Sequence, residues 1–338
     1  MSIRSNEPIL VTGGTGFLGA YIIRELVEKG YSVRSIRRTD KLPFFISPLV
    51  LDKVEWVQGD LLDIGGLEEA MEGIQTVIHA AAKVSLISRE RKAMFKTNIE
   101  GTSNLVNAAL SQNIKRLIHV SSVAALGRSD LGETLAEGKQ WEKIRLNSNY
   151  AISKYNGEME VWRAIGEGLN AAIVNPSTII GYGDWNVSSC AIFKHVYGES
   201  PWYTNGVNGF VSVEDVARAI VLIMDTDISG ERFVLSSENW SFRQLLDTIA
   251  DGFSKKHPKW EAGPISTQIA WRLEKLKSLF TGQPPLITRE SARMAQNTTY
   301  FDHSKMLQYF PEFSFRPVRE TLMEACEAYL RSILPRKP

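Results

Sequence analysis

The stretch Ile9-Leu10-Val11-Thr12-Gly13-Gly14-Thr15-Gly16-Phe17-Leu18-Gly19 joins a short apolar run to glycines at every third position. The residues that follow it carry apolar side chains at helical spacing, so the pattern predicts a strand, a tight turn and a helix. Gly13, Gly16 and Gly19 would let the backbone turn sharply and approach a pyrophosphate, with the amino end of the helix facing its charge. A P-loop is excluded because Ala20 stands where that site needs a lysine. A glycine turn without a ligand is the alternative.

The rest of the first half alternates strand-like runs with segments long enough for helices. The predicted strands are Tyr31–Ile36, Val54–Gln58, Thr76–His79, Arg116–Val120 and Ala171–Asn175. Such alternation is typical of a parallel sheet covered by helices on both faces. We therefore predict an α/β fold with a doubly wound parallel sheet.

A length of 338 residues favours two lobes, at about 100–200 residues per domain. The regular alternation ends near residue 181, where Gly, Trp, Tyr and Asn become frequent. We expect a dinucleotide-binding domain over 1–180, to which 210–236 return with a helix and a strand. A smaller mixed α/β lobe over 181–209 and 237–338 would bind the substrate.

Two helical signals lie in this second lobe. Ser241 and Gln244 fit a capping box at the start of a helix that runs to Ala250. A lysine-rich segment further on has apolar residues at helical spacing, and a helix packed between the lobes is favoured there over one lying on a membrane surface. Its apolar positions are Ile269, Leu273, Leu276 and Phe280.

Composition and charge exclude several classes of protein. Hydrophobic residues make up 43% and charged residues 23%, which is ordinary for a globular chain and excludes general disorder. The net charge of +1 gives no electrostatic reason to expect nucleic acid or an anionic membrane as a partner. Cys190 and Cys326 supply no disulfide framework, and the histidines show no metal-ligand spacing, so no metal is expected. Met1–Asn6 lacks a secretory signal, and we expect a cytoplasmic protein.

The end of the second predicted strand carries arginines, which bears on the choice of dinucleotide. An acidic residue there would bind the ribose 2′-OH of NAD, whereas arginine accommodates the 2′-phosphate of NADP. This chain offers Arg34, Arg37 and Arg38, with no acid before Asp40. Adjacent guanidinium groups can bind a phosphate through several charge-assisted hydrogen bonds, so NADP is favoured and NAD remains the alternative. The simpler interpretation is that these arginines are solvent-exposed residues of a loop and bind no ligand.

A tyrosine and a lysine four residues apart, Tyr150 and Lys154, would share one face of a helix. A free tyrosine, with a pKa of about 10, carries protons poorly at neutral pH, but a neighbouring ammonium group would favour the phenolate. Ser122 follows the strand Arg116–Val120, at the sheet edge where open α/β sheets bind ligands. Taken alone, each has a simpler interpretation, an exposed helical pair or a serine at the end of a strand.

Together these motifs resemble the extended branch of the short-chain dehydrogenase/reductase superfamily, the NAD(P)-dependent epimerases, dehydratases and reductases. Further matching motifs are Gly59-Asp60-Leu61, Val77–Ala82, Thr97–Thr102, His119–Ser122, Asn175-Pro176-Ser177 and Phe210–Ala217. The resemblance implies that Ser122, Tyr150 and Lys154 are catalytic. It also implies that the cofactor contacts Gly13, Thr15, Gly16, Phe17, Leu18, Gly19, Arg37, Arg38, Asp60, Leu61, Ala80, Ala81, Ala82, Asn98, Tyr150, Lys154, Pro176 and Ser177. Lys83 and Ser85 are weaker candidates for substrate contacts.

Departures from the family pattern narrow the expected chemistry. Leu126 stands where sugar-nucleotide epimerases of this branch often have a tyrosine, and Val123 and Ala124 replace the Asp-Glu pair of the dehydratases. The arrangement looks most like the dihydroflavonol 4-reductase-like group, which implies hydride transfer between nicotinamide C4 and a small-molecule secondary alcohol or ketone. A nucleotide-sugar epimerase that retains NAD and a non-catalytic NADP sensor are the alternatives. The family also suggests a homodimer.

Overall fold

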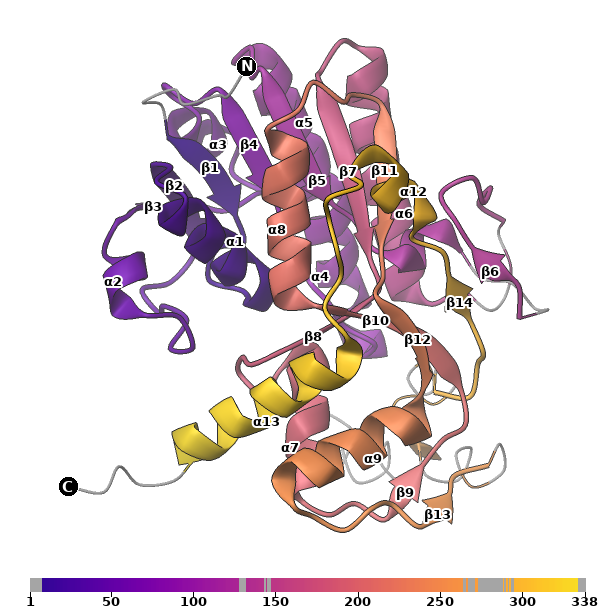
Figure 1. The fold of residues 1–338 in the computed structure, drawn as a ribbon. Coiled ribbons are helices and arrows are strands. Elements are labelled where there is room, and N and C mark those ends of the chain that lie inside the picture. The colour runs from indigo at the N-terminus through magenta and orange to yellow at the C-terminus, as the bar shows by residue number, and fades with distance from the viewer. Residues whose placement is uncertain are drawn as a thin grey trace.

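The computed structural model describes residues 8–127, 132–142, 144, 147–263, 266, 271–272, 288, 290, 292 and 295–333. It contains a large sheet with helices on both faces and a smaller lobe at one end of that sheet (Figure 1). The amphipathic pattern formed by Ile269, Leu273, Leu276 and Phe280 lies outside the described residues. No helix among the described residues is long and apolar enough to cross a membrane.

Seven strands form the large sheet. They are β1 (Ile9–Thr12), β2 (Val33–Arg37), β3 (Val54–Gln58), β4 (Thr76–His79), β5 (Arg116–Val120), β7 (Ala171–Pro176) and β11 (Glu231–Leu235). Their order is β11-β7-β5-β4-β1-β2-β3, and all neighbours are parallel. The predicted doubly wound fold is confirmed. One strand starts later than predicted, because the Tyr31 amide instead closes the preceding helix on the Leu26 carbonyl at 3.0 Å.

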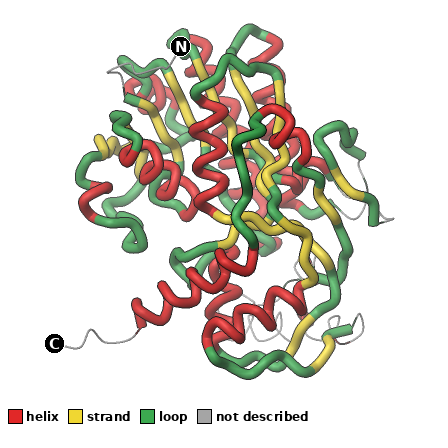
Figure 2. Tube along the Cα trace, in the orientation of Figure 1, coloured by secondary structure: helices red, strands yellow, loops and turns green. Residues whose placement is uncertain are grey.

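Helices cover both faces of this sheet, as Figure 2 shows with red helices beside yellow strands. One face carries α1 (Phe17–Glu28), α2 (Pro48–Leu51) and α8 (Val213–Met224). The other carries α3 (Ile64–Ala70), α5 (Gly101–Ser111) and α6 (Asn149–Gly166), with α4 (Arg91–Phe95) before α5. Successive strand side chains point to opposite faces, so Val11 joins the core under α1 and α8, while Leu10 joins the core under α5 and α6.

The smaller lobe is built around a three-stranded sheet. Its strands are β8 (Thr178–Ile180), β10 (Val207–Ser212) and β12 (Glu238–Ser241), in the order β12-β10-β8. Its helices are α7 (Ala191–Tyr197), α9 (Phe242–Phe253) and α13 (Val318–Ile333). Two short strand pairs flank it, β9 (Trp202–Tyr203) with β13 (Trp260–Glu261) and β6 (Thr134–Leu135) with β14 (Tyr300–Phe301). The short helix α12 (Ser304–Tyr309) contacts β11.

The chain passes between the two sheets more than once. β10 belongs to the small sheet, after which α8 packs on α1 and β11 pairs with β7 of the large sheet. The chain then returns to the small sheet through β12. The α9 helix begins as predicted, because the Ser241 hydroxyl accepts a hydrogen bond from the Gln244 amide at 3.1 Å.

The aromatic residues of the small lobe mostly form its core. Tyr182, Trp185 and Phe193 gather around Tyr329 of α13, with ring centroids 4.9 to 5.3 Å from that ring. Trp202 is different, since it is 46% exposed. Three of these four aromatic residues therefore pack chiefly against other residues of the lobe.

Candidate active site

Most of the predicted site residues lie at or just after the carboxyl ends of six strands of the large sheet, β1, β2, β3, β4, β5 and β7. Because the strands are parallel, these ends open on one edge of the sheet, toward the small lobe (Figure 1). β2 and β3 lie on one side of β1, whereas β4 and the later strands lie on the other. The connections therefore change direction at β1, the place where open α/β sheets bind ligands.

The glycine turn after β1 is tight enough to exclude side chains. Gly13 has a φ of +76°, and a Cβ there would lie 2.7 Å from the backbone of Ala81. A Cβ at Gly19 would lie 2.1 Å from the Gly13 carbonyl oxygen. At the start of α1 the amides have no side-chain cap from the described residues, so they are available to an anion. The turn thus fits the pyrophosphate of a dinucleotide.

The other predicted residues of this turn differ in exposure. Gly16 is exposed and begins α1, and Thr15 and Leu18 are half-buried. The Phe17 ring packs edge-on against Tyr21 at 5.7 Å. The backbone of the turn therefore faces solvent while the Phe17 side chain anchors it to the core.

The arginines at the end of β2 separate into two groups. Arg34 is used structurally: it donates to the carbonyls of Ala70 and Glu72 at 3.1 and 2.7 Å. Arg37 ends the strand and pairs with Asp40 at 3.0 Å. Arg38 is exposed, and no hydrogen bond or ion pair holds its side chain within the described part of the chain. Arg37 and Arg38 thus remain the candidates for a phosphate contact.

Asp60 and Leu61 lie just after β3. The Asp60 carboxylate accepts a hydrogen bond from the Leu62 amide at 3.0 Å, and the Leu61 carbonyl accepts one from Asn104 at 3.1 Å. Leu61 is buried against Gly101 at the start of α5, where a Cβ would lie 2.9 Å from the leucine Cβ. These contacts fix the loop beside the sheet edge on which the glycine turn lies.

The loop after β4 is held by Asn98, whose side chain is buried. Its amide oxygen accepts from the Lys83 amide at 2.8 Å, and its amide nitrogen donates to the Lys83 carbonyl and to Ser153 at 2.9 and 3.0 Å. Ala81 donates its amide to Thr12 at 3.2 Å, so this loop also contacts the end of β1. The Asn98 side chain therefore fixes the position of the segment that carries Ala80, Ala81 and Ala82.

The two weaker substrate candidates form a local cluster with Glu90. The Lys83 ammonium lies 3.2 Å from the Glu90 carboxylate. Ser85 is buried, accepts from the Ile87 amide at 3.1 Å, and its hydrogen bond is the main cause that lowers the pKa of Glu90. A substrate anion would have to compete with Glu90 for Lys83.

Ser122, Tyr150 and Lys154 come together from β5 and α6. The helix starts at Asn149 because the Ser148 hydroxyl caps it, accepting from the Ala151 amide at 3.0 Å. Tyr150 is thereby placed in the first turn, where the Ser122 side chain acts to lower the pKa of its phenol. Lys154, one turn further and 4% exposed, donates to the Val120 carbonyl at 2.9 Å.

Burial dominates the electrostatics of this trio. It raises the pKa of Tyr150, and the hydrogen bond from Ser122 opposes that effect only in part. Burial also lowers the pKa of Lys154 to about 8, against the opposing effect of the Glu158 carboxylate. The pKa of Tyr150 is therefore raised, the opposite of the direction expected from a neighbouring ammonium group and an oxidised nicotinamide ring, because desolvation of the phenolate is the largest effect on it.

Pro176 ends β7, and Ser177 follows it. Ser177 is 6% exposed, and its hydroxyl oxygen has no hydrogen-bond partner among the described residues. Buried hydroxyl groups are normally paired, so an unpaired one at the ligand-binding edge fits a polar group such as a carboxamide. This oxygen, the glycine turn and the uncapped helix start are together compatible with a nicotinamide dinucleotide.

Two buried histidines, His79 and His119, lie opposite each other on β4 and β5 with ring centroids 5.1 Å apart. Burial lowers the pKa of His79 to about 3 and that of His119 well below its usual value, so both rings are neutral at pH 7. Sequence reasoning did not single them out. Among the described residues no group of His, Cys, Asp or Glu could hold a metal ion.

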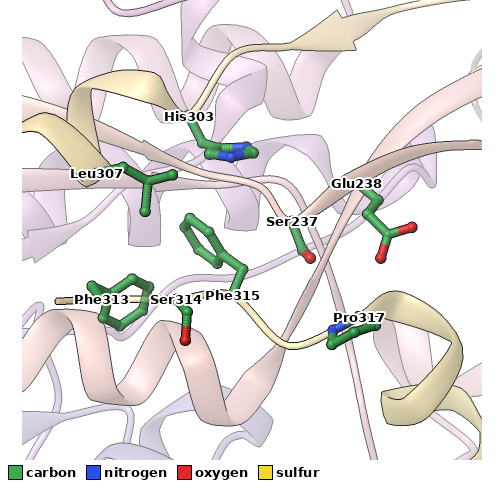
Figure 3. A pocket seen from close by; sticks show the side chains of 8 residues that line it. All are labelled: Ser237, Glu238, His303, Leu307, Phe313, Ser314, Phe315 and Pro317. Atoms are coloured by element: carbon green, nitrogen blue, oxygen red, sulfur yellow. The ribbon is translucent and has the colours of Figure 1, made fainter. Parts of the chain in front are cut away.

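A separate pocket of about 310 Å³ lies between the start of β12, α12 and the segment before α13 (Figure 3). None of the predicted cofactor or substrate residues lines it. Its lining residues are Ser237, Glu238, His303, Leu307, Phe313, Ser314, Phe315 and Pro317.

Comparison with known proteins agrees with this geometry. Residues 9–236 match the model of the NAD dependent epimerase/dehydratase family. A provisionally named dihydroflavonol 4-reductase of Synechocystis sp. is 34% identical over 311 residues, covering 88% of each chain. Cinnamoyl-CoA reductase 1 of Petunia hybrida is 28% identical and covers 75% of this chain and 79% of its own.

Solved structures give the same result. The crystal structure of gox2253 is 29% identical, with a TM-score of 0.81 over 97% of this chain and 99% of that one. The Bordetella bronchiseptica enzyme WbmH in complex with NAD+ shares the fold, with a TM-score of 0.74, 21% identity, and coverage of 96% and 98%. The chain therefore belongs to the NAD-dependent epimerase/dehydratase family, a family of oxidoreductases with a Rossmann-type nucleotide-binding fold.

Proposed function

We propose that this protein is an NADP-preferring oxidoreductase of the dihydroflavonol 4-reductase-like type, acting on a secondary alcohol or ketone. The bound cofactor supplies or accepts hydride at nicotinamide C4. In this proposal Tyr150 gives or takes the hydroxyl proton, and Ser122 polarises the substrate oxygen. Lys154 holds the nicotinamide ribose and keeps the site positive.

The observation that carries the proposal is the hydrogen bond from the Lys154 ammonium group to the Val120 carbonyl at 2.9 Å, which brings the helix stripe of Tyr150 and Lys154 to the end of β5, where Ser122 lies. Two hydroxyl donors that meet at one point can both reach a single substrate oxygen. The point lies at the carboxyl edge of β5, on the same sheet edge as the glycine turn. Reduction of a carbonyl group needs such donors beside the hydride donor.

The raised pKa of Tyr150 favours one direction of the reaction. A buried phenol keeps its proton at neutral pH and can donate it to the alkoxide oxygen formed during reduction. Oxidation would require the phenolate, which burial disfavours. The arrangement therefore supports carbonyl reduction as the main activity.

The preference for NADP depends on Arg37 and Arg38. Both stand at the carboxyl end of β2, and within the described part of the chain Arg37 forms one ion pair, with Asp40. A 2′-phosphate could replace that carboxylate through charge-assisted hydrogen bonds. The remaining arginine of this region, Arg34, is held by backbone carbonyls and takes no part in this proposal.

We propose that the lobe over 181–209 and 237–338 closes on the substrate, while 1–180 and 210–236 bind the cofactor. The relatives named for dihydroflavonol and cinnamoyl-CoA suggest an aromatic carbonyl compound as the substrate class. A homodimer is part of the same proposal and rests on the family resemblance alone.

The first test measures the binding of NADPH and NADH by calorimetry and then screens carbonyl compounds and nucleotide sugars with the tighter cofactor. We expect tighter NADPH binding and oxidation of one NADPH for each carbonyl reduced. Epimerisation of a nucleotide sugar without net use of the cofactor would instead support the epimerase. Tight NADPH binding with no turnover on any compound would support the NADP sensor.

The second test replaces Tyr150 with Phe. We expect Tyr150→Phe to lower kcat/KM at least about a thousandfold while NADPH binding stays nearly unchanged, because only the acidic proton is removed. Tyr155→Phe is the matched control, since Tyr155 lies on the same helix and stacks on Trp141 through its ring at 4.2 Å. Turnover of Tyr150→Phe at the parental rate would refute the proton-transfer role.

A further inference from the structure

A buried charged network lies behind the catalytic trio, on the side of β7 and β11. Glu158 follows Lys154 by one turn of α6, so the two side chains lie on the same stripe of the helix as Tyr150. Glu158 is 1% exposed, which is rare for a carboxylate unless it is paired. No motif singled out from the sequence includes it.

Each oxygen of the Glu158 carboxylate has a hydrogen-bond partner. One oxygen accepts from Asn175 of β7 at 2.8 Å. The other accepts from Arg232 of β11 at 3.0 Å and from Trp162 at 3.2 Å. The carboxylate thus connects α6 to the two strands at that end of the sheet.

The Asn175 link continues to the catalytic serine. The same amide nitrogen of Asn175 donates to the Ser122 carbonyl at 3.0 Å. The side-chain amide of Asn175 therefore joins the Glu158 carboxylate to the Ser122 backbone, and Asn175 is fully buried. A shift of Glu158 would therefore be transmitted through Asn175 to Ser122.

The charges of the network are unequal. Lys154 and Arg232 are two cations on either side of one buried carboxylate, Glu158. The Arg232 guanidinium is further held by the carbonyls of Glu137 and Lys139, the former at 2.9 Å from Nε. Removal of the carboxylate charge would take this counter-ion from the buried Lys154 and the partly buried Arg232, and the lysine is the one that can lose its proton.

We propose that Glu158 is a positioning residue of the active site, which holds Ser122 in place through Asn175 and keeps Lys154 protonated against its burial. This inference rests on the proposed oxidoreductase function. The pKa of Lys154, lowered to about 8 by burial and raised by Glu158, is consistent with it. The groups that face Lys154 from β4 and β5 are His79 and His119, both neutral at pH 7, and from its own helix Tyr150, also neutral.

The principal test does not require activity. NMR titration of the Lys154 side chain in the ligand-free protein measures the pH at which the amine is half protonated, here called its midpoint. The signal is assigned by its loss in Lys154→Arg. We expect Glu158→Gln to move the midpoint down by about one pH unit. Glu160→Gln is the matched control, because Glu160 lies on the same helix and pairs with Arg163 at its surface. The control should leave the midpoint unchanged.

A second variant tests the same charge balance in the opposite direction. Arg232→Gln leaves Lys154 as the only cation beside Glu158, so its midpoint should rise. If Glu158→Gln does not fold, this variant decides the question. A midpoint that stays at the parental value in whichever variant folds would overturn the proposal that Glu158 sets the charge of Lys154.

Activity measurements separate positioning from charge. Glu158→Gln should lower kcat with little change in substrate KM and move the alkaline limb of the pH profile downward, and Glu158→Asp should restore part of both. Asn175→Ala breaks the link to Ser122 and should lower kcat without moving that limb. A loss of thermal stability in Glu158→Gln with an unchanged limb and kcat would mean a structural role only. If the parent protein reduces no carbonyl compound, the proposed function and the positioning role fail together, whereas the NMR midpoints still decide the charge role.

Discussion

Side chains of one residue type make different contacts at the sheet edge that carries the predicted site. Three arginines in and just after β2 illustrate this, because Arg34 binds backbone carbonyls, Arg37 pairs with Asp40 and Arg38 is exposed. Only the geometry separates the structural arginine from the two candidates for cofactor recognition.

Replacing Arg37 and Arg38 by serine should weaken NADPH binding about 10- to 100-fold and leave NADH binding nearly unchanged. The reason is the loss of charge-assisted hydrogen bonds to the 2′-phosphate, which at these solvent-accessible side chains together contribute about 1.4–2.7 kcal/mol. Calorimetric titration with both cofactors measures the ratio. Arg34→Gln is the control and should leave the ratio as it is, since Arg34 is engaged elsewhere. An unchanged NADPH affinity in the double variant would contradict the proposed NADP preference.

The pH dependence should report Lys154. Its pKa is about 8 in the folded protein against 10.5 ordinarily, so the ammonium group is lost as pH rises through about 8. We expect carbonyl reduction to fall above that pH, with NADPH binding weakening in parallel. Because the unfolded chain binds more protons between pH 8 and 10.5, the same group makes stability rise with pH across that window. Lys154→Arg should remove this alkaline limb, and its persistence would assign the limb to another group.

At the scale of elements, the close packing of the glycine turn against the loop after β4 determines where a dinucleotide can lie. Gly13 combines a positive φ with a Cβ position 2.7 Å from the Ala81 backbone. Backbone groups cannot move aside as flexible side chains do, so both the conformation and the space require glycine.

Gly13→Ala should destabilise the protein by at least about 2–3 kcal/mol and abolish cofactor binding. Gly73→Ala is the matched control, because Gly73 has a similar φ of +70° but nothing within 4 Å of its Cβ position. That change should cost about 1 kcal/mol from backbone strain alone and leave cofactor binding intact. Chemical denaturation and NADPH titration measure the two effects. Equal losses in both variants would show that the close approach to Ala81 is unimportant.

For the whole molecule, the segment before α13 connects the two lobes by charged contacts with α8. Asp215 is fully buried, and it accepts from the Arg316 amide at 2.7 Å and from Arg218 at 2.9 Å. Arg316 also pairs with Glu214 at 2.6 Å and with Glu324 of α13. These contacts hold the small lobe against the helix that covers the large sheet.

Asp215→Ala should lower the free energy of unfolding by about 2–3 kcal/mol, because it leaves the Arg316 amide without its acceptor and removes the carboxylate that pairs with Arg218. Hydrogen exchange of α13 should rise with it, since the segment before that helix loses its anchor. Glu324→Ala, which removes an exposed partner of Arg316, should cost less than about 1 kcal/mol. A cost for Asp215→Ala as small as that of Glu324→Ala would contradict a connecting role.

The sequence alone determined the strand, turn and helix around Gly13, the positions along the chain of the parallel strands up to β7 (apart from the start of β2) and the helical stripe of Tyr150 and Lys154. These features depend on local rules, namely the apolar period, the conformational freedom of glycine and the four-residue spacing of a helix face. Only the tertiary structure decided that the pKa of Tyr150 is raised and that Glu158 is linked to Ser122 through Asn175. Burial and contacts between distant strands arise from the packing of the whole chain, which no short stretch of residues specifies.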